Sequence, residues 1–373
     1  MDFGLRAELE RDNNVSRSSA TQAATQGISQ EDTIFTPSVT VDVWVPVGRQ
    51  AVFLKGAAGY SFYDKNDQLD RERASLNGGI EGGVGPCATT LTGDLIYGQR
   101  EITDFDLSQV VGNVVRTTRV GLHVNCSAPT GLGAVFGASQ EWTDNSASQL
   151  TSADAERQFL TGGLSYSRPA LGTVTAFTNF EKIDYPNRQL LGGGSDGYEM
   201  TAVGVSYARR LGARIEGTAS ISYANVEPAA SNLPGAPSID FSGTTYSGDL
   251  SYRASSRMRF RGNFSRSVTP TLAIGQQYEV QTAYGLGMDY DIGSRFKLKL
   301  GVAQNESEAH GVSAAVPNVM TSSTTKMIYG ALRYEQSRRL AFTLSARHEE
   351  RDANTPQFNF NGERVGIAAD LAF

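Results

Sequence analysis

The C-terminal stretch, residues 363–373, shows a hydrophobic pattern that recurs along the whole chain. Apolar side chains occupy every second position: Val365, Ile367, Ala369, Leu371 and Phe373. The positions between them carry polar, charged or small residues. Because successive side chains of a β-strand point to opposite faces, this two-residue period predicts a strand with one apolar and one polar face.

The same period predicts eighteen strands in all. A segment at 13–30 that is rich in Ser, Thr, Gln and Asn predicts a long mobile loop after the first strand. The expected strands span residues 2–10, 35–45, 52–62, 73–84, 89–100, 109–125, 132–142, 157–167, 173–182, 197–208, 214–225, 244–254, 258–267, 279–292, 295–304, 325–335, 340–349 and 359–373.

The connections between these strands alternate in length. Short turns lie at 46–49, 85–87, 127–131, 168–171, 209–212, 254–257, 292–295 and 336–339. Longer polar connections lie between them, among them 143–154, 183–196, 227–241, 268–277 and 305–323. An even strand number with this alternation is typical of an up-and-down transmembrane β-barrel, with short periplasmic turns and longer extracellular loops.

We therefore predict an all-β fold, in which residues 1–373 form a single antiparallel transmembrane β-barrel domain. The expected strand number is about eighteen, with sixteen as the alternative, and both termini are expected in the periplasm. A soluble propeller or sandwich is the competing interpretation. It is disfavoured because no blade motif repeats and no long apolar strand or helix remains to cover so much sheet.

The closing strand resembles the C-terminal signature of bacterial outer-membrane β-barrels, in which the assembly machinery recognises the final aromatic residue. The resemblance implies an outer-membrane location in a Gram-negative cell and contact with outer-membrane lipid and lipopolysaccharide. It also implies that Phe373, together with Leu371, acts as the assembly signal.

Composition agrees with an exported barrel. No run approaches the ~18 apolar residues that a membrane-spanning helix needs, and a net charge of −6 argues against nucleic acid as a partner. The residues after Met1 do not form a basic start followed by an apolar core. If the protein is exported, we expect this sequence to be a mature or trimmed form.

Cys87 and Cys126 are the two cysteines of the chain. They flank two expected strands whose connecting loop, 103–108, is centred between them, so antiparallel pairing sets them opposite each other. Both also share a face with the apolar residues of their strands. We predict a disulfide at the periplasmic rim, which an oxidising periplasm permits; two free buried thiols are the alternative.

Alternation also places basic side chains on the polar face, toward the periplasmic ends of the later strands. We call these residues the basic arc: Arg214, Arg253, Arg259, Arg261, Lys297, Lys299 and Arg333. Carboxylates such as Glu216, Asp249, Asp289, Asp291 and Glu335 are interspersed. A basic excess on one side of the lumen favours anions, whereas a mixed wall of paired charges needs no solute.

The sequence gives little support for catalysis or for metal binding. His123, His310 and His348 have no partners at metal-ligand spacing. His310 is expected in a loop and His348 near the outer rim. We predict no enzyme activity, no metal and no cofactor.

Two classes of transport function remain. Eighteen strands close to a backbone diameter of ~35 Å, wide enough for an aqueous channel, and no plug or long inward-folded loop is evident. One class is a diffusion porin for small solutes. The other is secretion of polar or anionic solutes with a periplasmic or plug partner. The strand number, short loops and missing plug resemble the porin-like barrels of exopolysaccharide-export systems, which implies polysaccharide as a cargo. A structural barrel or a barrel enzyme is the least favoured.

Overall fold

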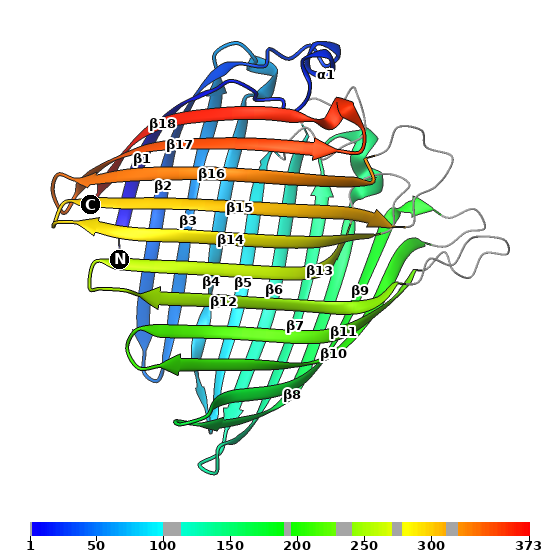
Figure 1. Cartoon of the computed structure of the whole chain (residues 1–373), viewed down its shortest axis with the longest axis vertical. Coiled ribbons are helices and arrows are strands. Elements are labelled where there is room, and N and C mark those ends of the chain that lie inside the picture. The colour runs from blue at the N-terminus through cyan, green and yellow to red at the C-terminus, as the bar shows by residue number, and fades with distance from the viewer. Residues whose placement is uncertain (1, 100–112, 190–194, 229–240, 271–277, 311–319) are drawn as a thin grey trace.

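A computed structural model shows that the strands form one closed antiparallel sheet (Figure 1). It describes residues 2–99, 113–189, 195–228, 241–270, 278–310 and 320–373. Each strand pairs with its neighbours in sequence, and β1 closes the sheet by pairing with both β2 and β18. The predicted closed barrel of eighteen strands is confirmed.

All eighteen strands coincide with expected ones, although several run further than expected into the long connections. They are β1 Asp2–Asp12, β2 Asp32–Val47, β3 Gln50–Tyr63, β4 Arg71–Val84, β5 Cys87–Gln99, β6 Val114–Ser127, β7 Leu132–Asn145, β8 Ala155–Arg168, β9 Gly172–Gln189, β10 Ser195–Leu211, β11 Ile215–Pro228, β12 Phe241–Arg253, β13 Met258–Pro270, β14 Tyr278–Ile292, β15 Phe296–His310, β16 Ser322–Glu335, β17 Leu340–Ala353 and β18 Phe360–Ala372. Residues 109–112, the expected start of the sixth strand, lie outside the described residues. So do 229–240, 271–277 and 311–319, which belong to the expected long connections.

The two faces of the sheet differ as the alternation predicts. Large apolar side chains on the outer face are exposed, and Leu164 and Leu286 keep 72% and 67% of their surface accessible. A water-soluble protein would bury so many apolar side chains, whereas lipid covers them at no cost. The inner face carries mainly polar, charged and small residues, so the barrel has an apolar outer surface and a polar lumen.

The two ends of the barrel are built differently. At one end, which we call the short-turn end, tight turns join the strands and both termini lie nearby (Figure 1). Gly48 and Gly293 have φ angles of +64° and +72° in two of these turns, a conformation that glycine adopts without strain. The other end, which we call the mouth, carries the longer connections.

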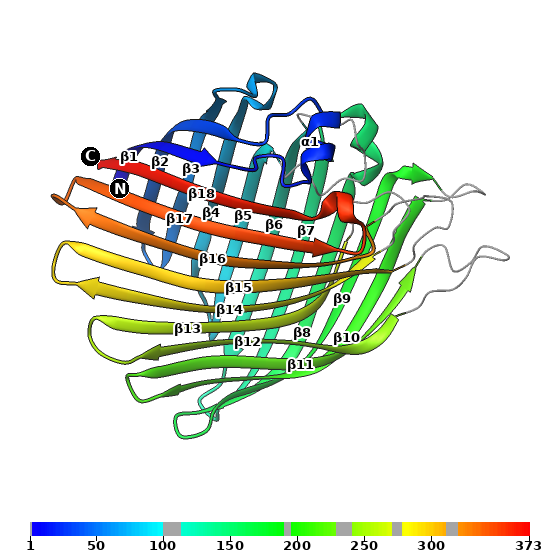
Figure 2. The ribbon, with the colours of Figure 1, turned by 45° about the horizontal axis from the view of Figure 1, so that its top comes forward.

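The connection from β1 to β2, residues 13–31, corrects an expectation. A mobile loop was predicted, but the structure contains α1 (Ala20–Thr25) and buries Asn14, Ser16 and Arg17. Figures 1 and 2 show α1 at the mouth, away from the two termini. No helix in the described part of the chain is long and apolar enough to span a membrane. We call residues 13–31 the mouth segment.

The wall overlaps itself near the mouth. Pairing between β12 and β13 stops at Tyr246 and Arg266, although both strands continue beyond these residues. Tyr278 lies on the same face of β14 as its outward-facing side chains, whereas Tyr198 faces inward on β10. The two rings nevertheless lie 5.9 Å apart in one buried cluster. The outer face of β14 therefore packs against the inner face of β10, with β14 on the lumen side.

Candidate functional site

Most of the basic arc gathers around one hollow in the lumen wall at the short-turn end. Strand register places Arg253 opposite Arg259, Arg259 opposite Asp289, and Asp289 opposite Lys299. Because directly paired residues point to the same face, these side chains form one row across four strands. The hollow has a volume of about 370 Å³, and Arg253, Arg259, Arg261, Lys297 and Lys299 line it.

The two remaining members of the basic arc lie beside this hollow. The backbone carbonyl of Arg214 accepts a hydrogen bond from the amide of Arg253 at 2.7 Å. Arg333 lines a neighbouring hollow of about 500 Å³ that also includes Asp370 and the short turn before β17. The structure therefore brings five of the predicted cations into one group and places the other two at its edges.

Ion pairs divide the basic arc into two sets. Arg261 lies 2.5 Å from Asp289, and Lys297 lies 2.6 Å from Glu335. Arg333 pairs with Asp370, which also binds Arg6 at 3.2 Å. These cations are neutralised by their neighbours.

The other set consists of Arg214, Arg253, Arg259 and Lys299, which are exposed. Within the described residues, no carboxylate lies within ion-pair distance of them. A cation without a protein partner in a water-filled lumen attracts mobile anions. The site as a whole therefore combines a neutral, paired part with an unpaired basic part.

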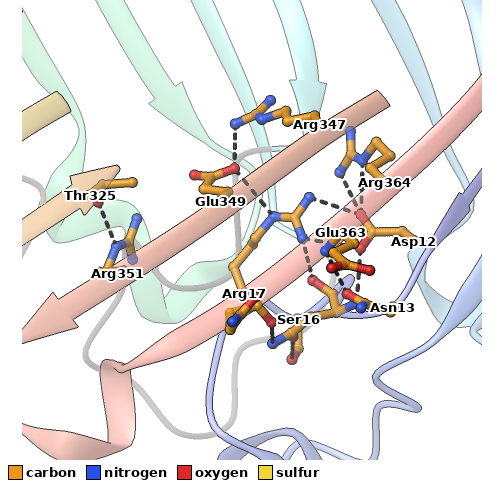
Figure 3. A network of polar contacts seen from close by, with 12 residues as sticks. Asp12, Asn13, Ser16, Arg17, Thr325, Arg347, Glu349, Arg351, Glu363 and Arg364 are labelled. Carbon is orange, nitrogen blue, oxygen red and sulfur yellow. Dashed lines mark hydrogen bonds and ion pairs between the residues drawn. The ribbon is translucent and has the colours of Figure 1, made fainter. Parts of the chain in front are cut away.

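Arg17 attaches the mouth segment to the inner wall, which sequence reasoning did not predict. Its side chain is 3% exposed, and its guanidinium lies 2.8 Å from Asp12 and 4.0 Å from Glu349 (Figure 3). Arg364 of β18 approaches the same Asp12 carboxylate at 2.7 Å. Asp12 thus bridges the buried guanidinium of Arg17 and the half-buried guanidinium of Arg364, and the mouth segment is anchored to β1, β17 and β18.

Two backbone features accommodate this anchor. A Cβ atom at Gly362 would lie 2.8 Å from Arg17 Nη1, so the absence of a side chain there makes room for the guanidinium. Arg17 has a φ angle of +49°, unique among the described non-glycine residues. Such a conformation costs about 1–3 kcal/mol and persists only where surrounding contacts enforce it. No sequence signal distinguishes Arg17 from other loop arginines, since its partners are distant in the chain.

A pair of lumen-facing aromatic residues was also missed. The rings of Trp44 and Phe53 stack 6.3 Å apart near the short-turn end, and Trp44 remains 49% exposed. The strict alternation of β2 could have revealed them, because Trp44 lies out of phase with the apolar residues Val43 and Val45.

The predicted disulfide is confirmed. Cys87 and Cys126 lie directly opposite each other on β5 and β6 and are covalently linked. They share the outward face with Leu91, whose side chain is exposed. The loop at 103–108, on which the prediction partly relied, lies outside the described residues.

The C-terminal residues occupy the short-turn end. Leu371 pairs with Leu5 on β1 and with Leu340 on β17. The backbone amide of Phe373 donates a hydrogen bond to the carbonyl of Phe3 at 2.8 Å, and the residue is 67% exposed. An exposed ring is accessible to lipid or to another protein, and its role as an assembly signal stays a prediction.

The histidines take structural positions. His310 ends β15 and stacks on Tyr278 at 5.2 Å, so the expectation of a loop position is wrong. His348 lies on β17, with its Nδ1 3.8 Å from Glu363, and His123 lies on β6. Within the described ranges, no three His, Cys, Asp or Glu side chains are grouped so that they could hold a metal ion.

Comparison with protein families identifies residues 182–373, just over half of the chain, as matching the family described as "Putative beta-barrel porin 2". The chain belongs to this family. The protein is thus a porin-like channel of the bacterial outer membrane. The matched region contains the whole basic arc but neither Arg17 nor the disulfide. A comparison with curated proteins found no match.

Solved structures support the same fold. OccK2 (OpdF) of Pseudomonas aeruginosa, solved in complex with glucuronate, is 11% identical with a TM-score of 0.50, over 100% of this chain and 97% of that chain. OccAB3 of Acinetobacter baumannii is 10% identical with a TM-score of 0.47, over 100% and 98% of the two chains. The likeness to OccK2, at 11% identity, shows the barrel fold alone. Neither the family nor these structures support the resemblance to exopolysaccharide-export barrels.

Proposed function

We propose that this porin passes small anionic solutes across the outer membrane and that the basic arc is the site that favours them. The observation that carries the proposal is the set of exposed, unpaired cations around the short-turn hollow. Arg253, Arg259 and Lys299 face water with no carboxylate partner among the described residues, so a passing anion meets a favourable potential there. Carboxylates suit this site because guanidinium groups bind them with two parallel hydrogen bonds.

General diffusion of small solutes is the second candidate. It is favoured by the ion pairs of Arg261 and Lys297 with Asp289 and Glu335, which reduce the net positive charge of the wall. In both cases we propose that the short turns and the termini lie in the periplasm, as the alternation of connection lengths suggests.

Reversal potentials of the purified barrel in planar bilayers under a salt gradient test the proposal. Replacing Arg259→Glu together with Arg261→Glu should weaken or reverse a preference for anions, because it changes the local charge by four units. The matched control is Arg11→Glu with Arg116→Glu, which makes the same change on the outer face near the mouth and should leave the reversal potential near that of the wild type.

An unchanged reversal potential in the lumen variant would contradict the anion preference and favour general diffusion. The same recording measures single-channel conductance. A stable open conductance of the barrel alone supports a diffusion channel, whereas a pore that stays closed without added periplasmic protein would favour partner-dependent secretion.

A further inference from the structure

Two exposed arginines lie on the outer face of the barrel at the short-turn end. Arg168 ends β8, and its Nε donates a hydrogen bond to the hydroxyl of Tyr166 at 2.8 Å while its guanidinium lies 5.5 Å from the ring centroid. Arg209 of β10 donates to the hydroxyl of Tyr207 at 3.5 Å. Both tyrosines face outward, where their rings suit the level of lipid headgroups. The two guanidinium groups are thus held at the edge of the apolar surface.

A glycine separates these arginines. Arg168 pairs with Gly172 on β9, and the pairing of Thr173 with Ala208 brings Gly172 beside Arg209. A Cβ atom at Gly172 would lie 3.1 Å from the Cβ of Arg209. The three residues form one outward-facing row across β8, β9 and β10, so the backbones that carry the two arginines are two strand spacings, roughly 10 Å, apart.

The charges and the surface around this row fit an anion attached to an apolar chain. Within the described part of the chain, no carboxylate lies within ion-pair distance of Arg168 or Arg209. Both guanidinium groups retain unused donors, because Tyr166 accepts only from Nε of Arg168 and Tyr207 only from Nη1 of Arg209. Exposed apolar side chains lie on the same face further along the strands: Leu132 opposite Tyr166, and Leu164 two positions before Tyr166.

We infer that Arg168 and Arg209 bind the phosphate of an anionic glycerophospholipid between them. The arginines supply charge-assisted hydrogen bonds to the phosphate oxygens, Gly172 places no side chain between them, and the leucines contact the acyl chains. A free phosphate ion would gain nothing from the apolar side of this site. The lipid is therefore the expected occupant, and the site is independent of the lumen and of solute transport.

The experiment measures binding of phosphatidylglycerol to the detergent-purified barrel by native mass spectrometry. Replacing Arg168→Gln together with Arg209→Gln should raise the dissociation constant about tenfold or more, since each arginine near a membrane surface contributes about 1 kcal/mol. The matched control is Arg338→Gln with Arg339→Gln, which removes the same charge from the same end of the barrel and, because these residues lie outside the row, should raise the constant by a clearly smaller factor. Heat-modifiable gel migration verifies that each variant is folded.

The possible results separate the specific site from its alternatives. Selective loss in the Arg168 and Arg209 variant supports the site. Equal loss in both double variants would indicate diffuse attraction by the rim and overturn it, as would full retention in both. Displacement of the lipid by millimolar inorganic phosphate at constant ionic strength would identify a free-phosphate site and also overturn the inference.

Discussion

The two ends of the barrel use arginine in opposite ways. At the mouth, Arg17 is buried and shares the Asp12 carboxylate with Arg364. At the short-turn end, Arg253 and Arg259 stand opposite each other, exposed and without a carboxylate between them. A buried guanidinium needs a partner because desolvation is costly, whereas an exposed one remains stable in water and available to solutes. Arg17 therefore has a structural role at the mouth, whereas Arg253 and Arg259 at the short-turn end remain free to interact with solutes.

Removing the shared carboxylate at the mouth should have the largest effect on stability. In Asp12→Asn, Arg17 and Arg364 lose their common anion, and we expect attachment of the mouth segment to weaken by about 3–5 kcal/mol. The segment should leave the wall, so trypsin should cleave after Arg17, which is protected in the native protein. Mass mapping of the fragments measures this.

The control for this prediction is Asp291→Asn at the short-turn end. Asp291 is exposed, so its loss should change stability by less than about 0.5 kcal/mol. If Asp12→Asn leaves Arg17 as protected as the wild type does, the buried ion pairs are not what holds the mouth segment.

The disulfide gives the short-turn end a covalent link in place of buried ion pairs. Its cysteines are 39 residues apart, and the double change Cys87→Ser with Cys126→Ser should lower the free energy of unfolding by up to about 4 kcal/mol in the chain-entropy model. Denaturant midpoints of barrels refolded in detergent measure the loss. Ion selectivity should stay unchanged, because the bond lies on the outer face; a changed selectivity would show that it shapes the lumen.

The terminal aromatic residue should affect assembly more than stability. Phe373→Ala, or deletion of 371–373, loses about 1–3 kcal/mol of apolar burial in lipid, a modest loss for a closed barrel whose strands have no free edge. We expect poor insertion in cells but near-normal refolding in vitro, judged by heat-modifiable gel migration. A variant that accumulates folded in the cytoplasm would argue against recognition of Phe373 during outer-membrane assembly.

The smallest expected effect concerns an exposed carboxylate at the mouth. Hydrogen bonds from Lys65 and Arg11 lower the pKa of Glu31, so its contribution to stability is present above the pKa of the unfolded chain and is lost as pH falls through the lowered pKa. Hydrogen exchange of the mouth segment should accelerate slightly in that acidic range. Glu31→Gln should remove this pH dependence, and its persistence would assign it to another group.

The sequence predicted whatever depends on local alternation. Strand number, outward faces such as that of Leu164, and the opposition of Cys87 and Cys126 all follow from a two-residue period and short turns. The basic arc followed from the same parity. Parity did not show which of these cations remain unpaired. Lys297, for example, pairs with Glu335 on the next strand through side-chain geometry that the two-residue period does not encode.

Contacts between distant segments could not be predicted. Arg17 and Gly362 are close only because closing the barrel brings β18 beside β1. The sequence of a polar loop does not indicate which part of the barrel wall it will contact. The overlap at the mouth was hidden for a related reason. Tyr278 has the parity of an outward-facing residue, and only the separation of β12 from β13 turns that outer face into a buried one.

The overlapping wall near β12 and β13 also divides the lumen into two regions with different chemistry. The overlap and the mouth segment both place protein on the lumen side at the mouth, whereas the hollow lined by the basic arc lies at the short-turn end. If the basic arc favours anions as proposed, changes in these two regions should be separable. Substitutions in the mouth segment should alter the size of the solutes that pass, and substitutions in the basic arc should alter the charge of the solutes that are preferred.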